Sequence, residues 1–177
     1  VRDAIRVYRK IQKQFENFHK QDVVAFNLGF AHQSLAEKET AKTVFLNLIN
    51  DYTESHLIPD AHLAVGEIAF DKERFETALE HYKAIENYPR SRVYPYGLYK
   101  AAWTLYNLSN APAALKKLEE VVAFGRRVKE QNIDARLDLR REALFDMALF
   151  YEDVLPPENA VNYFTEQTGE LPLVPVL

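Results

Sequence analysis

The sequence predicts an all-α fold in which a pair of helices repeats along the chain. Small residues recur with spacings of 37, 37, 36 and 46 residues, at Ala4, Ala41, Ala78, Ala114 and Ala160. A bulky apolar residue follows each by four positions: Tyr8, Phe45, Tyr82, Leu118 and Phe164. Twelve positions before the last four stand further small residues: Gly29, Gly66, Ala102 and Ala148. Such a period is typical of a solenoid of stacked repeats.

Each repeat contains two stretches with helical periodicity. In the second stretch of one repeat, apolar residues fall on a single stripe made of Phe75, Ala78, Leu79, Tyr82 and Ile85. Pro89 ends that stretch because proline cannot donate to a helix. In the first stretch, Gly66 should cost about 1 kcal/mol relative to alanine. We therefore expect a neighbouring helix to approach Gly66 too closely to allow a side chain.

This pattern resembles the tetratricopeptide repeat, whose signature is a Leu–Gly pair, then alanine, a bulky aromatic residue and a final proline. Leu28–Gly29, Ala41 and Phe45 match it, as do Val65–Gly66, Phe75, Ala78, Tyr82 and Pro89. The later repeats match more loosely. The resemblance implies an α-solenoid of antiparallel helix pairs in a right-handed superhelix. The segment ENYPRS, residues 86–91, resembles the bacterial cell-envelope branch of the family.

The spacing predicts one array over residues 1–170. We expect a half repeat over residues 1–20, then repeats over residues 22–53, 59–89, 95–130 and 134–168. About nine extra residues precede the last repeat, and they predict elongated helices that meet near residues 132–134. Asp134 is the expected N-cap. An apolar tail, LPLVPVL, occupies residues 171–177.

Composition and motifs give no sign of an enzyme. The net charge of −4 argues against nucleic acid as a partner, and the lack of cysteine excludes disulfides and cysteine-bound zinc. No HExxH, P-loop, GxSxG or GxGxxG motif occurs, so no catalytic, cofactor or metal site is expected. No apolar stretch is long enough to span a membrane. The chain begins at Val1 without a signal peptide, which suggests a fragment or processed product, and a bacterial cell envelope is the favoured compartment.

The family resemblance implies that the first helix of each repeat lines a concave groove that binds extended peptides. It places eleven groove residues in this sequence: Phe26, Phe30, Leu63, Glu67, Phe70, Tyr96, Tyr99, Trp103, Tyr106, Phe145 and Leu149. Most are aromatic or aliphatic, which is unusual for a surface in water and typical of a binding site. We therefore expect a scaffold that holds an apolar, neutral or basic protein segment, with or without proline.

Three alternatives remain open. The aromatic residues, Trp103 among them, could pack between helices as core. The chain could be a structural spacer whose groove is filled from within a larger protein. It could also be an accessory region of an enzyme. A groove that grips an acidic terminus is disfavoured, because Phe26 and Phe30 stand where that subfamily has lysine and asparagine.

The tail offers apolar residues that should dock on protein: Leu171, Leu173, Val174, Val176 and Leu177. Three docking sites are available. One is the end of the last helix near Val161 and Phe164, another is the groove of a neighbouring molecule, and the third is the chain's own groove. Docking on a neighbour would make the protein self-associate.

Overall fold

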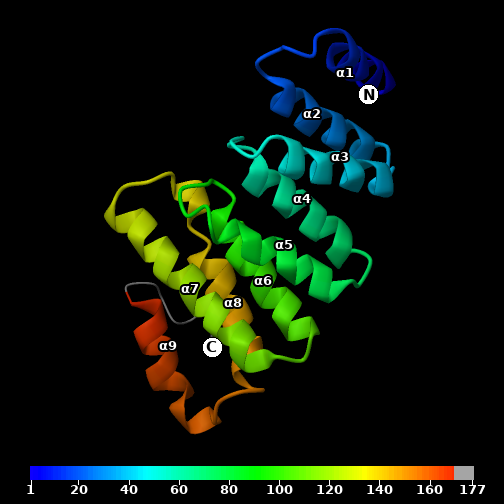
Figure 1. The fold of residues 1–177 in the computed structure, drawn as a ribbon. Helices are drawn as coiled ribbons and strands as arrows, with labels where there is room; N and C mark the ends of the chain where they lie inside the picture. The colour runs from blue at the N-terminus through cyan, green and yellow to red at the C-terminus, as the bar shows by residue number, and fades with distance from the viewer. Residues whose placement is uncertain (170–177) are drawn as a thin grey trace. The chain divides into compact units, whose positions relative to one another are not determined.

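The computed structural model describes residues 1–169, which divide into two compact units, residues 1–91 and residues 92 onward. All regular secondary structure in residues 1–169 is helical, and within each unit consecutive helices pack against each other (Figure 1). This confirms the predicted all-α class. The tail residues predicted to dock lie outside the described residues, and the superhelical hand stays a prediction.

The first unit contains five helices: α1 (Arg2–Gln14), α2 (Gln21–Ser34), α3 (Lys38–Asp51), α4 (Ile58–Phe70) and α5 (Phe75–Ile85). The helices α2 to α5 lie side by side in chain order (Figure 1). Their shared core is apolar and includes Phe45, Leu48, Ile58, Val65 and Ile68. The connections are short, so each helix must run back along the one before it.

Gly29 and Gly66 lie directly against aromatic rings of the following helix. A Cβ atom at Gly29 would lie 2.5 Å from a ring carbon of Phe45, and one at Gly66 would lie 2.5 Å from a ring carbon of Tyr82. Both rings are completely buried. Carbon atoms cannot approach so closely, so each glycine leaves the space that the ring fills. The predicted reason for Gly66 is therefore correct.

The same type of turn ends the first helix in three successive helix pairs, at the ends of α2, α4 and α6 (Tyr94–Asn107). Ala36, Glu73 and Ser109 have φ angles of 57°, 56° and 57°, in the left-handed region. The N–H of the residue after each donates to a carbonyl five residues back, over 3.0, 3.0 and 2.9 Å. Glycine normally favours this conformation. The turn recurs here with no glycine in it.

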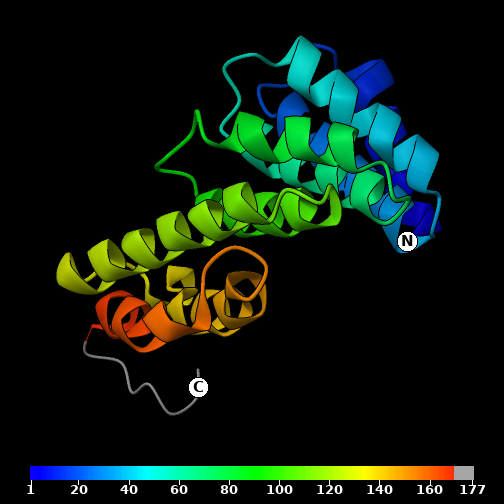
Figure 2. The ribbon, with the colours of Figure 1, turned by 90° about the horizontal axis from the view of Figure 1, so that it is seen from below.

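The second unit contains α6 (Tyr94–Asn107), α7 (Ala111–Glu130), α8 (Arg140–Tyr151) and α9 (Ala160–Thr168). Two short 3-10 helices, η1 (Ala135–Leu137) and η2 (Pro157–Asn159), lie in its connections. α7 packs against α6 and α8, and both α8 and α9 lie along it (Figure 2). Leu98, Leu118, Leu144, Met147 and Phe150 form its buried interior.

The extra residues before the last helix pair lengthen only one of the two helices that were predicted to be elongated. They lengthen α7 to 20 residues, whereas α8 has 12 and α9 has 9. Asp134 accepts a hydrogen bond from the Arg136 N–H at 3.1 Å and so begins η1 rather than an α-helix. Asp138 accepts one from the Arg140 N–H at 3.1 Å. These two local hydrogen bonds order the connection, and α8 begins only at Arg140.

Candidate functional site

The predicted groove residues of α6 are tied to carboxylates of α8 and of the turn that follows it. Trp103 Nε1 donates to Asp146 Oδ2 at 2.8 Å, and the Tyr99 hydroxyl donates to the same oxygen. The Tyr106 hydroxyl donates to Asp153 Oδ2 at 2.9 Å. The first helices of two successive repeats are therefore joined by polar bonds from aromatic side chains.

The same aromatic residues pack on one buried ring of α8. The Tyr106 ring stacks on Phe150 with centroids 4.1 Å apart and planes 8° apart, and Trp103 meets Phe150 edge-on at 5.1 Å. Phe150 is completely buried, but Tyr99, Trp103 and Tyr106 are half-buried. Each is fixed at one edge and open to solvent at another. They form a rigid aromatic surface, which we call the α6–α8 surface.

Three of the predicted groove residues in this unit are exposed. Phe145 is 68% exposed, Leu149 is 49% exposed and Tyr96 is 37% exposed. Phe145 and Leu149 are four residues apart on α8 and so lie on one face of it. In the sequence they directly precede Asp146 and Phe150, which the α6 rings contact. An exposed apolar pair on such a helix is typical of a surface that binds another chain.

The first unit has its own aromatic surface on α2. Phe26 and Phe30 meet edge-on at 4.9 Å, and both also contact the buried Phe45 ring, at 5.8 and 5.7 Å. Phe30 is exposed and Phe26 is half-buried. On α4, the predicted residues Leu63, Glu67 and Phe70 are half-buried, and Phe70 meets Phe75 of α5 at 5.3 Å. This surface offers less exposed apolar area than the one in the second unit.

The environment of the α6–α8 surface raises the pKa of both its tyrosines. Burial, followed by the hydrogen bond to Asp146, raises the pKa of Tyr99 to about 12. The hydrogen bond to Asp153 is the main cause that raises the pKa of Tyr106. Both hydroxyls donate within the unit. What the surface presents to a ligand is mainly ring faces.

Asp146 and Phe150 were not predicted as site residues. They lie two positions before and two after Ala148, outside the positions that the family resemblance assigns to the groove. The equivalent positions around Gly66 hold Ala64 and Ile68, which are ordinary packing residues. In the last repeat, Asp146 occupies the position that Ala64 has in its own repeat, and the repeat before it carries Tyr99 and Trp103. A carboxylate at a packing position, one repeat after these two donors, is the signal that could have found this cluster.

Replacing Asp146 by alanine is expected to lower the free energy of unfolding by about 1–3 kcal/mol, since two partly buried donors lose their acceptor. The pKa of Tyr99 should fall toward its usual value, because one of the causes that raise it is removed. Urea denaturation and ultraviolet titration of the tyrosines measure the two effects. Asp153→Ala is the matched control, since its bond to Tyr106 is exposed. Equal stability of Asp146→Ala and the parent protein would contradict the role given to Asp146.

Metal binding and membrane crossing find no support in the part of the chain that the structure describes. Residues 1–169 contain no group of three or more histidine, aspartate or glutamate side chains placed to hold a metal ion. None of the helices described is both long and apolar enough to cross a membrane.

Comparisons with known proteins agree on the fold. A family profile described as "Tetratricopeptide repeat" matches residues 24–55, which hold most of α2 and all of α3. Two solved structures of nearly identical TPR-like repeats from a putative kinesin light chain of Podosopora anserina are similar over most of their length. One of them, a form with a single substitution, has a TM-score of 0.66 at 11% identity, covering 93% of this chain and 81% of that one. This chain has a tetratricopeptide-like repeat fold. The other structure has a TM-score of 0.59 at 14% identity, covering 94% and 92%.

The sequence identity to both structures is low. Identities of 11% and 14% show the fold alone. A search of curated protein sequences found no match. Repeats of this type generally mediate contacts between proteins, which fits a scaffold. The resemblance of ENYPRS to a cell-envelope branch has no support in these matches and stays a prediction.

Proposed function

We propose that this protein is a non-catalytic scaffold that holds an extended apolar segment of a partner protein on the α6–α8 surface. The observation that carries the proposal is the exposure of Phe145 and Leu149 on α8, the helix on which the rings of Tyr99, Trp103 and Tyr106 are fixed. Covering what remains exposed of Phe145 and Leu149 would contribute about 1–2 kcal/mol each, since both side chains are already partly buried. The fixed rings add contact area with little further loss of side-chain freedom.

Charge and hydrogen bonding narrow the segment that would bind. The tyrosine hydroxyls and the tryptophan N–H already donate to aspartates, so the surface offers few free donors. On and just after α8 the four acidic residues outnumber the two arginines, Arg140 and Arg141, which disfavours an acidic segment; the acidic residues are Glu142, Asp146, Glu152 and Asp153. A neutral or basic apolar segment fits best. Proline suits it, because an extended proline-rich chain loses little entropy on binding and packs on aromatic rings.

The proposal is tested with a synthetic peptide of sequence LPLVPVL, which the chain itself carries at residues 171–177. Trp103 is the only tryptophan in the sequence, so intrinsic fluorescence reports directly on the α6–α8 surface. We expect the peptide to change this fluorescence saturably. The double variant Phe145→Ser/Leu149→Ser should bind at least about tenfold more weakly, as expected for loss of central anchors. Its thermal midpoint should stay close to that of the parent, since both side chains are exposed.

Val7→Ser is the matched control, because Val7 is an exposed apolar residue on α1 of the other unit. It should bind the peptide as the parent does. Absence of any saturable change in the parent protein, or equal binding by the double variant, would reject the proposal.

A further inference from the structure

The exposed apolar pair of α8 has a carboxylate before it and another after it on the same face of the helix. The four exposed residues of this face, separated by three, four and three positions, are Glu142, Phe145, Leu149 and Glu152. Such spacing places side chains in a row along one side of a helix. Glu152 follows the last residue of α8 and keeps helical backbone angles, so it continues the row.

Both carboxylates act on the aromatic side of the α6–α8 surface. Burial and its hydrogen bond are the main causes that raise the pKa of Tyr99, and the negative charge of Glu142 contributes to the same shift. For Tyr106 the main causes are its hydrogen bond and then burial, and the charge of Glu152 contributes. One carboxylate therefore lies near each tyrosine, toward opposite ends of the surface.

The two carboxylates have no cationic partner within residues 1–169. No side-chain hydrogen bond or ion pair joins Glu142 or Glu152 to another described residue. Of the two arginines that begin α8, Arg140 pairs with Asp138 at 2.7 Å. Arg141 precedes Glu142 directly and offsets part of its charge, so Glu152 should attract a cation more strongly. A basic side chain of a ligand can pair with either carboxylate without displacing a partner.

We infer that the segment bound on the α6–α8 surface carries a basic residue on each side of its apolar centre, and that Glu142 and Glu152 select it. This inference rests on the proposed function. It adds a requirement for the position of the charges to the preference for an apolar segment. Two basic residues at one end of the segment would reach only one of the carboxylates.

The helix also sets the separation of the two basic residues. A segment that covers both Phe145 and Leu149 runs along α8, past carboxylates ten positions apart. At the usual helical rise their backbone positions are about 15 Å apart. A proline-containing extended chain advances about 3 Å per residue, so its basic residues should lie about five positions apart.

The experiment follows Trp103 fluorescence of the full chain at low salt, with three peptides blocked at both ends. The flanked peptide is Arg-Leu-Pro-Val-Leu-Arg, the one-ended peptide is Arg-Arg-Leu-Pro-Val-Leu, and the neutral peptide is Gln-Leu-Pro-Val-Leu-Gln. Since exposed ion pairs are weak, we expect the flanked peptide to bind about fourfold or more tightly than the neutral one, and about twofold or more tightly than the one-ended one. In Glu142→Gln/Glu152→Gln the three affinities should be equal. Both positions are exposed, so folding should be unaffected.

The matched control is Glu76→Gln/Glu80→Gln, which removes two exposed carboxylates from α5 of the other unit. It changes the net charge equally and should keep the preference of the parent for the flanked peptide. An equal loss of preference in this control would mean general charge attraction and overturn the inference. Binding of the flanked and one-ended peptides with equal affinity by the parent, or a preference that persists in Glu142→Gln/Glu152→Gln, would overturn the inference but leave the proposed function intact. Failure of all three peptides to bind would reject the proposed function and this inference with it.

Discussion

Gly66→Ala is expected to destabilise the first unit by about 1–3 kcal/mol, although alanine is the better helix former by about 1 kcal/mol. The new methyl group would lie 2.5 Å from one ring carbon of Tyr82 and 2.8 Å from another. The Tyr82 ring is completely buried between helices and cannot swing into solvent. The clash therefore has to be relieved by pushing α4 and α5 apart. The overpacking cost should exceed the gain in helix propensity.

Urea denaturation followed by circular dichroism measures the effect, and a smaller ring partner provides the control. In Gly66→Ala/Tyr82→Leu the leucine leaves room for the methyl group, so the double variant should be more stable than the sum of the two single changes predicts. Gly29 and Phe45 form the same pair in α2 and α3, and Gly29→Ala should behave alike. A Gly66→Ala protein as stable as the parent would show that the ring does not require glycine.

This glycine–ring pairing is what made the fold predictable from sequence. Each glycine contacts a bulky residue on the next helix, so the two must lie a fixed number of positions apart in the sequence. The separation is 16 positions both from Gly29 to Phe45 and from Gly66 to Tyr82. Repetition of that separation gave the helix pairs and their order. It could not show the helix ends, since these depend on local bonds. Asp134 and Asp138, each bonded to the arginine two residues on, set the connection before α8.

Two other features were hidden from sequence for different reasons. The left-handed turns at Ala36, Glu73 and Ser109 carry no glycine, so nothing in the composition marks them. Helix packing on both sides fixes the backbone there and overrides the local preference. The role of Asp146 depends on which face of α8 meets α6, a matter of packing that periodicity within one helix does not determine.

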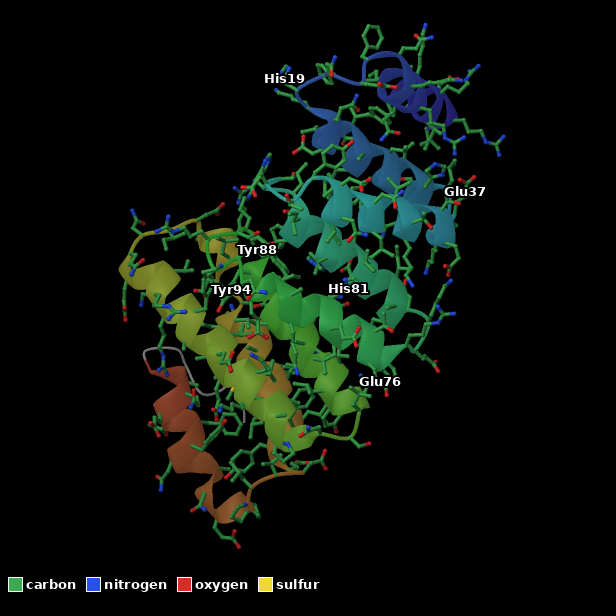
Figure 3. All side chains as sticks on the ribbon, in the orientation of Figure 1. His19, Glu37, Glu76, His81, Tyr88 and Tyr94 are labelled. Atoms are coloured by element: carbon green, nitrogen blue, oxygen red, sulfur yellow. The ribbon has the colours of Figure 1, made fainter. Side chains whose placement is uncertain are left out.

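A histidine pair in the first unit predicts a dependence of stability on pH. His62 on α4 and His81 on α5 are half-buried, and Figure 3 labels His81. Their Nδ1 atoms lie 2.9 Å apart and their ring centroids 5.1 Å apart. Burial, and then the proximity of His81, lower the pKa of His62 to about 4. Burial, and then the charge of Lys42, lower the pKa of His81. One ring donates and the other accepts, so the pair is stable only while at least one ring is neutral.

Stability is therefore expected to fall as the pH is lowered from about 6.5, the usual histidine value, to about 4. In that interval His62 is protonated in the unfolded chain but neutral in the folded protein, so lowering the pH favours unfolding. The loss should be about 1–3 kcal/mol, after allowance for the partial exposure of the ring. The difference in free energy of unfolding between the parent and His62→Gln, measured by urea denaturation at pH 7.5, 6.0, 5.0 and 4.5, isolates this contribution from that of the carboxylates. A parent and a His62→Gln protein with parallel pH profiles would show that His62 takes up its proton equally well in the folded and unfolded states.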